Sequence, residues 1–156
     1  MEYLDEMFNQ FSEAFLGNME GEGDIAFRNQ IDTSILDYSL DSLNEVDRYL
    51  KVLHQSPSSF SDVEYQNIVV WGGAYVGEVI RRNSNIPYHW VHYDEYIKSR
   101  GPEFKVMIPI MLTTHAFLVD INSNYMTMPM NKIARWIDEG DSNNVHFYAT
   151  ADILRK

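Results

Sequence analysis

Cysteine is absent from this chain, and uninterrupted apolar segments are short. Without cysteine the protein has no disulfide bond, no thiolate nucleophile and no metal site built on sulfur. No apolar run approaches the ~20 residues that cross a bilayer. Residues 1–7 are acidic and amphipathic, whereas a secretory signal begins with basic residues followed by an apolar run. We therefore expect a soluble, cytoplasmic protein with no membrane partner.

Basic residues are scarce, because 12 lysines and arginines stand against 23 aspartates and glutamates, a formal net charge of −11. Residues 1–50 hold twelve of the acids, and Arg28 and Arg48 are their only bases. Such a field repels nucleic acid and attracts a basic protein. The alternative is a solvated acidic face that only keeps the protein soluble. The candidate interaction residues are acids of this first third: Asp5, Glu6, Glu13, Glu20, Glu22 and Asp24.

Motifs of the common catalytic sites are also missing. The sequence holds no Gly-x-Ser-x-Gly motif, no Walker loop and no dinucleotide-binding fingerprint. His89-x-x-His92 comes nearest to a metal motif, but residues three apart on a strand point to opposite faces. We therefore expect no bound metal, no cofactor and no catalytic residue. An interaction protein is favoured over an enzyme.

The strongest helical pattern covers residues 61–82. Ser61 and Glu64 have the spacing of a capping box, in which each side chain accepts a backbone N–H of the first turn. The middle of the segment is apolar on most faces, which predicts a helix that is buried on most faces. Three glycines interrupt this apolar middle: Gly72, Gly73 and Gly77. Each costs about 1 kcal/mol relative to alanine in a helix, so we interpret them as points of close approach by another backbone.

The remaining pattern predicts an α+β fold, with helices packed on an antiparallel sheet of about three strands. Apolar residues at helical spacing predict helices at 2–16, from about 39–42 to 54, at 129–139 and, capped by Asp141 or Ser142, up to about 153. A strand over 145–150 is the alternative for the last segment. Alternating composition predicts strands over 86–96, 104–112 and 116–120.

Domain organisation follows from the glycines between residues 17 and 34, which predict a linker. The chain then forms one domain over 1–156, with its main α+β body at 35–156. The amphipathic helix in residues 1–17 is either an appendage or part of the core. Its apolar stripe is covered by the protein itself or by a second copy of the chain, so a homo-oligomer formed through this helix is one alternative.

Three segments occur in order along the chain: LDYSLDSLNEVD at 36–47, GAYVGEVIRR at 73–82 with Trp90 shortly after, and NKIARWIDEGDS at 131–142. Together they resemble a family of small bacterial proteins of unknown function. Where that family commonly has a glycine pair before the tryptophan, this chain has Pro87, Tyr88 and His89. The resemblance implies an α+β domain, and it implies no activity, substrate or catalytic residue.

Glu78 is the most informative single residue, because a carboxylate inside an apolar helix needs a partner. Arg81 and Arg82, three and four residues further on, are the natural candidates for a structural ion pair. The alternative is a binding or catalytic carboxylate. Its site would be formed with three further side chains, those of Tyr75, Trp90 and His92.

Two functions follow from these features. The first is a non-enzymatic protein that binds a basic partner, for example an immunity-type inhibitor of a bacterial toxin. The second is a small hydrolase or ligand-binding domain with its site around Glu78 and Trp90. Five of the eight methionines lie between residues 107 and 130, where they either fill the core or line an adaptable binding surface.

Overall fold

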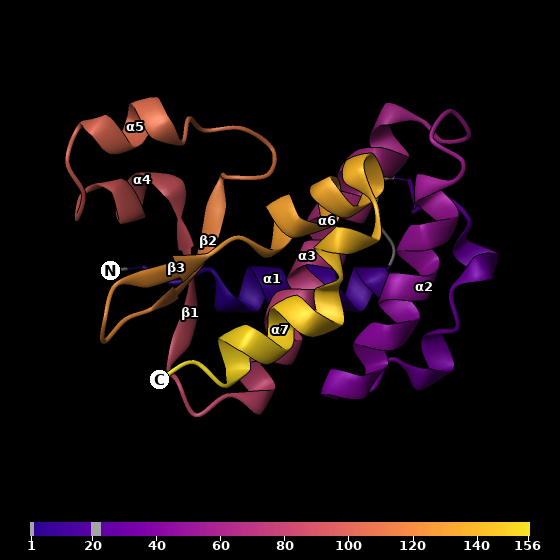
Figure 1. Cartoon of the computed structure of the whole chain (residues 1–156), viewed down its shortest axis with the longest axis horizontal. Coiled ribbons are helices and arrows are strands. Elements are labelled where there is room, and N and C mark those ends of the chain that lie inside the picture. The colour runs from indigo at the N-terminus through magenta and orange to yellow at the C-terminus, as the bar shows by residue number, and fades with distance from the viewer. Residues whose placement is uncertain (1, 20–22) are drawn as a thin grey trace.

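A computed structural model describes residues 2–19 and 23–156 of the chain. Its helices and strands are α1 (Asp5–Phe15), α2 (Leu43–His54), α3 (Asp62–Asn83), β1 (Tyr88–His92), α4 (Tyr93–Ile97), α5 (Glu103–Met107), β2 (Ala116–Asp120), β3 (Tyr125–Thr127), α6 (Pro129–Glu139) and α7 (Val145–Ile153). Figure 1 shows the longer helices gathered around α3, with the sheet at one end of this body and α4 and α5 beyond it. The predicted α+β class is therefore confirmed. Among the described helices, none combines the length and the apolar character that crossing a membrane would require.

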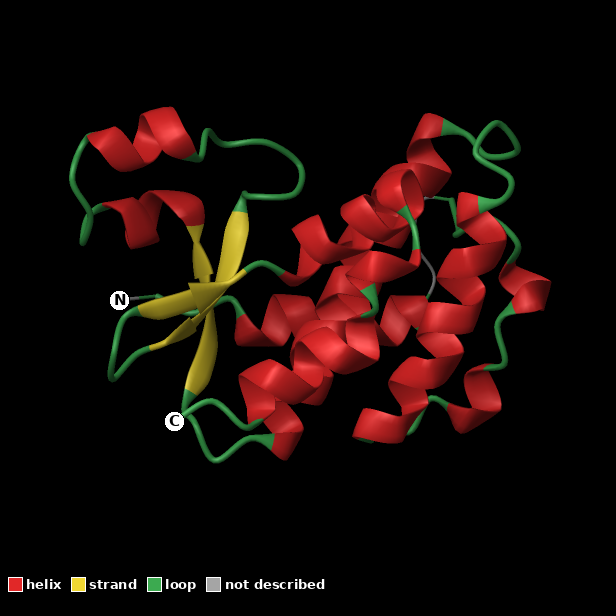
Figure 2. Cartoon of the chain, viewed as in Figure 1, coloured by secondary structure: helices red, strands yellow, loops and turns green. Residues whose placement is uncertain are grey.

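The sheet is antiparallel with the order β1-β2-β3 (Figure 2). It separates two apolar cores. Side chains alternate between the faces of a strand. Trp90 pairs with Leu118, and both face the main helical core. The other face supports a second core, formed by Val91, Tyr93, Tyr96, Phe117 and Val119. Because both faces are covered, every residue of β2 is buried.

Helix α3 forms the centre of the main core, and its capping box is present as the sequence predicts. The Ser61 hydroxyl accepts the Glu64 N–H at 3.1 Å, and the Glu64 carboxylate accepts the Ser61 N–H at 2.9 Å. Two of the glycines mark close approaches. A Cβ at Gly73 would lie 2.7 Å from the Cα of Met130 on α6. A Cβ at Gly77 would overlap the Trp90 indole. Packing therefore offsets the helix propensity lost at these positions.

Helix α1 is part of the main core rather than an appendage. Phe8 and Phe15 are fully buried, and α1 packs along α3. Gly17 follows the end of the helix, and its φ of +80° is easily reached only without a side chain. The predicted linker also needs correction within the described residues. Ile25, Ala26 and Ile31 are buried in the same core, so this segment packs where a free linker was expected.

Residues 93–115 connect β1 to β2 by a long excursion, and here the prediction of a strand over 104–112 is wrong. The segment forms the short helices α4 and α5 and then a loop. Phe104 and Ile108, four residues apart, lie against the second core as a helix allows. The aromatic residues Tyr93 and Tyr96, assigned to a strand by composition, also belong to α4 and bury their rings in this core.

The two C-terminal helices agree with the sequence pattern in type. Pro129 is the first residue of α6, and Gly140, with φ of +101°, ends it. The last segment is the helix α7, so the alternative of a strand over 145–150 is excluded. Its cap is Asn144, whose side chain accepts the Phe147 N–H at 2.8 Å. The expected caps, Asp141 and Ser142, instead lie in a short 3-10 turn.

Candidate functional site

Glu78 is buried and paired inside the protein. Only 2% of its surface is exposed. Arg81 Nη1 lies 2.9 Å from Oε2 and 3.2 Å from Oε1 of the carboxylate, and the Trp90 indole N–H donates to Oε2 at 3.4 Å. Both oxygens therefore have a donor, which is what a buried carboxylate requires. The geometry favours the structural ion pair over a carboxylate directed at a substrate.

Arg81 extends this pair to Asp5 on α1. Its Nη2 lies 3.0 Å from Asp5 Oδ2, and its Nε–H donates to the backbone carbonyl of Tyr88 at 3.0 Å. The same Asp5 oxygen is 2.6 Å from Nδ1 of His89, whose ring stacks on Tyr3 at 4.0 Å between centroids. The result is one continuous chain of polar contacts from Glu78 through Arg81 and Asp5 to His89.

This chain of polar contacts closes the outer edge of β1. The Trp90 N–H donates to Asp5 Oδ1 at 2.7 Å, and the Trp90 carbonyl accepts the Leu4 N–H at 2.8 Å. With the bond from Arg81 to Tyr88, three outward backbone groups of the edge strand are satisfied. An edge strand with free N–H and C=O groups is a template for unwanted pairing. The network around Glu78, Arg81 and Trp90 therefore holds α1, α3 and β1 together at this edge.

Tyr75 and Arg82, other predicted members of the Glu78 site, contact a different set of residues. The Tyr75 hydroxyl shares a hydrogen bond of 2.7 Å with Ser42 and accepts the Tyr38 N–H at 3.1 Å. Arg82 stacks over the Tyr38 ring at 3.5 Å and donates to the Asn9 side chain at 2.7 Å. Burial raises the pKa of Tyr38 to about 12. These contacts fasten residues 38–42 and α1 to α3.

His92 lies apart from the Glu78 network, at the end of β1, where it caps α4. Its Nδ1 accepts the Asp94 N–H at 3.1 Å. This leaves the ring proton of a neutral imidazole on Nε2. The side chains around it form an open cleft of about 280 Å³. The cleft lies between the segment before α1 and the start of α4. Its lining residues are Glu2, Leu4, His92, Asp94 and Glu95.

The acids proposed for interaction divide into paired and free groups. Asp5 is in the network above, Glu13 accepts the Tyr38 hydroxyl at 3.0 Å, and Asp24 pairs with Arg28 at 2.6 Å. Glu6 is exposed on α1. Glu20 and Glu22 lie outside the described residues. Sequence counting cannot separate such groups, because Asp5 and Glu13 each have a partner that is 25 or more residues away.

Two further acids missed by the sequence argument are buried structural anchors. Asp47 on α2 accepts the Trp136 indole N–H at 2.9 Å and the backbone N–H groups of Val145 and His146 at 2.7 and 3.2 Å. It therefore occupies the N-terminus of α7, where the helix dipole favours an anion. Glu45 pairs with Arg48 at 2.6 Å. Arg48 chiefly, with the Asp32 N–H in support, lowers the pKa of Glu45 against the opposing effect of burial.

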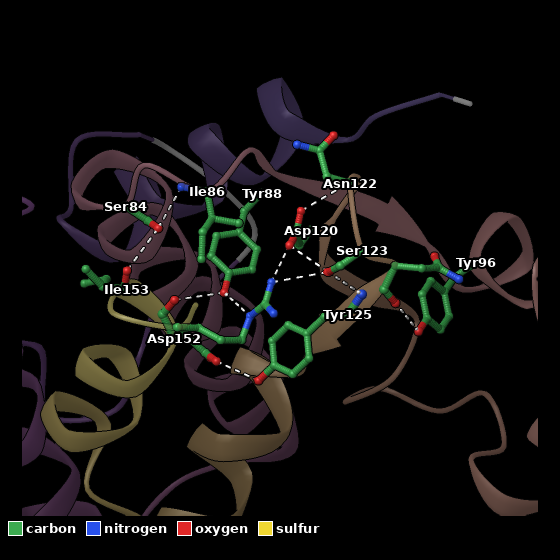
Figure 3. A network of polar contacts seen from close by, with 12 residues as sticks. Ser84, Ile86, Tyr88, Tyr96, Asp120, Asn122, Ser123, Tyr125, Asp152 and Ile153 are labelled. Carbon is green, nitrogen blue, oxygen red and sulfur yellow. Dashed lines mark hydrogen bonds and ion pairs between the residues drawn. The ribbon is translucent and has the colours of Figure 1, made fainter.

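A third polar cluster joins α7 to the sheet (Figure 3). The Tyr125 hydroxyl donates to Asp152 Oδ1 at 2.7 Å, and the Tyr88 hydroxyl donates to the Asp152 carbonyl at 2.9 Å. Burial, together with the Asp152 carboxylate, raises the pKa of Tyr125. Asp120 accepts hydrogen bonds from Ser123 and Arg155. Burial alone would raise the pKa of Asp120, but these donors and a backbone N–H outweigh it and lower that pKa.

A separate cleft of about 210 Å³ lies where α2 and α6 end. His54 Nδ1 donates to the Ile137 carbonyl at 2.7 Å, and Lys51, Glu139 and Asp141 complete the lining. Both basic and acidic side chains therefore line this cleft. Within residues 2–19 and 23–156, no cluster of three or more histidine, aspartate or glutamate side chains could hold a metal ion.

Comparison with protein-family models, with curated proteins and with solved structures gives no match in any of the three. The functional argument therefore rests on the geometry of this chain. Of the two clefts described, the one at the start of α4 is the one that includes a residue of the acidic N-terminal segment, Glu2. It combines three carboxylates with the apolar side chain of Leu4.

Proposed function

We propose that this protein is a non-enzymatic interaction module that binds a basic protein, inserting one arginine or lysine side chain of the partner into the cleft at the start of α4. The observation that carries the proposal is the lining of this cleft. Glu2, Asp94 and Glu95 supply carboxylates, and Leu4 supplies an apolar wall. The aliphatic stem of arginine or lysine packs on apolar surface while its charged head binds carboxylates.

The size of the cleft supports a side chain rather than a whole metabolite. Its volume of about 280 Å³ lies below the ~300 to ~1,000 Å³ typical of small-molecule sites. Asp94 is well suited to bind a partner, because 70% of its side chain is exposed and its contact with His92 Nδ1, at 3.7 Å, is an ion pair only when that imidazole is protonated. Glu95 is already paired with Lys98 at 2.8 Å, so it contributes mainly through the local field.

The charge of the whole chain supports the same partner. A net charge of −11 accelerates the approach of a basic protein and disfavours acidic competitors. An immunity-type inhibitor that covers the nucleic-acid groove of a basic toxin is one concrete form of this function. Acid–base chemistry at Glu78 is not required, because that carboxylate is occupied by Arg81 and Trp90.

The experiment that tests the proposal measures binding of a fluorescent oligo-arginine peptide by anisotropy, at low and high salt. The test variant is Glu2→Gln with Asp94→Asn. Its matched control, Asp41→Asn with Asp138→Asn, changes two exposed acids elsewhere and therefore carries the same net charge. A surface charge pair is worth about 1 kcal/mol at 4 Å in water, so we expect at least about fivefold weaker binding for the test variant only.

Binding must also weaken with added salt, because both partners are charged. Equal losses in the test and control variants would show that only net charge matters and would overturn the assignment to this cleft. Binding that is indifferent to salt would overturn the electrostatic mechanism itself. Amide chemical shifts that change at residues 2–4 and 92–95 on peptide addition would locate the contact independently.

A further inference from the structure

The excursion between β1 and β2 carries an exposed apolar surface that the acidic cleft does not use. The exposed fractions are 83% for Val106, 77% for Met107, 55% for Ile110 and 54% for Met111. These four residues, called here the α5 patch, lie within six positions of one another. Exposed large apolar residues that are grouped in this way mark an interaction site more often than isolated ones do.

The α5 patch is distinct from the side of α5 that packs against the sheet. The inner face is formed by Phe104 and Ile108, which lie against the second core. Phe104 meets the Phe117 ring edge-on at 6.2 Å between centroids. On an ordinary surface helix the solvent-exposed positions would be polar, yet here Val106, opposite Phe104, and its neighbour Met107 are exposed. Both faces of α5 are therefore apolar, and only one is covered.

Hydrogen bonds hold the loop that completes the patch. The Ile108 carbonyl accepts the Tyr93 hydroxyl at 2.6 Å. Thr114, which is 5% exposed, donates its hydroxyl to the Pro109 carbonyl at 2.7 Å and accepts the Met111 N–H at 2.9 Å. The loop thus presents Ile110 and Met111 in a fixed conformation, which lowers the entropy lost on binding.

Charge selects the occupant of this surface. Residues 93–115 carry three acids and three bases, a net charge of zero, in a chain whose total is −11. Two copies that met at any strongly acidic face would repel each other, whereas at this excursion they would not. A basic partner has no reason to prefer a neutral surface over the acidic cleft. The excursion also projects from one end of the helical body (Figure 1), so a contact through α5 keeps the helical bodies of two copies apart.

We infer that the α5 patch is a self-association surface, through which a second copy of this chain docks its own α5 patch across a two-fold axis. An isologous contact of this kind needs the same self-complementary surface on both subunits, and an apolar patch flanked by both charge signs provides it. The patch is small, so the dimer is weak and depends on concentration. This assignment moves the homo-oligomer contact from the N-terminal helix, which is buried against α3, to α5.

The test is light scattering of the full chain after size-exclusion chromatography, over a wide range of protein concentrations. The monomer mass is 18.2 kDa, and we expect the wild-type mass to rise towards twice this value. Added salt must strengthen the dimer, because it screens the repulsion between two acidic bodies. This dependence is opposite in sign to that of basic-partner binding, so failure of one proposal is distinguishable from failure of the other.

Val106→Glu and Ile110→Glu are the test variants, with Phe147→Glu as the matched control. Phe147 is 76% exposed on α7, so its variant adds the same charge at an apolar position outside the patch. Burying an unpaired carboxylate in an interface is costly, and we expect at least about tenfold weaker dimerisation for the test variants alone. Because all three positions are exposed, thermal melting must show folded proteins.

Methyl signals of methionine supply a second readout. Met107 and Met111 must shift with protein concentration, whereas Met19, which is 44% exposed elsewhere, must not. A wild-type chain that stays monomeric at every concentration and salt level would overturn the inference and would leave the patch to a different protein. An equal effect of Phe147→Glu would also overturn it, since the contact would then not depend on α5.

Discussion

The carboxylate of Asp5 accepts the backbone N–H of Trp90 at 2.7 Å, across 85 residues of sequence. The other oxygen of the same carboxylate contacts Arg81 at 3.0 Å and His89 at 2.6 Å. One side chain at the start of α1 therefore closes a strand edge and balances an arginine on α3. A residue that sequence analysis groups with a free acidic face has a structural role in this protein.

Replacement of Asp5 with alanine should destabilise the protein by about 1–3 kcal/mol, because it leaves the Trp90 N–H and part of the Arg81 guanidinium without a partner. Urea unfolding followed by tryptophan fluorescence measures the change. The matched control is Glu6→Ala, which removes the same charge from an exposed neighbour on the same helix. If both variants unfold at the same urea concentration, the edge-closing role of Asp5 is wrong.

The three glycines of α3 should respond differently to alanine. At Gly72 the new Cβ would lie 3.5 Å from Phe15 and 3.6 Å from Ile133, which is ordinary contact, so Gly72→Ala should gain up to about 1 kcal/mol of helix propensity. Gly77→Ala should lose about 1–3 kcal/mol by overpacking against Trp90. Gly73→Ala should also destabilise, since Met130 backbone blocks the site. Thermal melting of the three variants tests this order, and a stabilised Gly77→Ala would contradict it.

Asp47 should be among the most sensitive acids of the first third. Alanine there removes the acceptor of the Trp136 indole and of two N-terminal N–H groups of α7, and we expect a loss of about 2–4 kcal/mol in unfolding free energy. Asp41→Ala provides the comparison, because Asp41 is exposed in a turn just before α2. Hydrogen exchange should show faster opening of α7 in the Asp47 variant; unchanged protection there would refute the anchoring role.

Asp120 should make stability depend on acid pH. Its pKa is lowered in the folded state because the donors around it, Ser123, Arg155 and a backbone N–H, outweigh burial. A lowered pKa means that the stabilisation is fully present above the ordinary value of 3.8 and is lost as the pH falls through the folded value. Urea midpoints from about pH 6 to about pH 2 measure this. In Asp120→Asn the acid-dependent loss should be smaller, and an identical pH profile would contradict the assignment.

Much of the fold follows from local patterns in the sequence. The capping box at Ser61 and the apolar middle of α3 predict the central helix, and both are present. Pro129 and Gly140 define the limits of α6 in the same way. These signals work because the partners are a few residues apart, so propensity and hydrogen bonding agree without help from distant parts of the chain.

The remaining features depend on contacts that no local pattern encodes. Residues 104–112 have the composition of a strand, but β2 pairs with β1 and β3 on its two sides, and the segment instead covers the face of the sheet. Tertiary packing thus overrides local β propensity. Glu78 and Arg81 were recognisable as a pair from their spacing, whereas Asp5 and His89 were not, since they come from α1 and β1.

The separate core beneath α4 and α5 divides the molecule into two regions of unequal resistance to opening. The excursion of residues 93–115 buries Tyr93 and Tyr96 against Val91, Phe117 and Val119 of the sheet, and it is joined to the body through β1 and β2. Local unfolding needs only the contacts of the region that opens. We therefore expect amide hydrogen exchange to be faster in the excursion than in α3, whose side chains belong to the larger core.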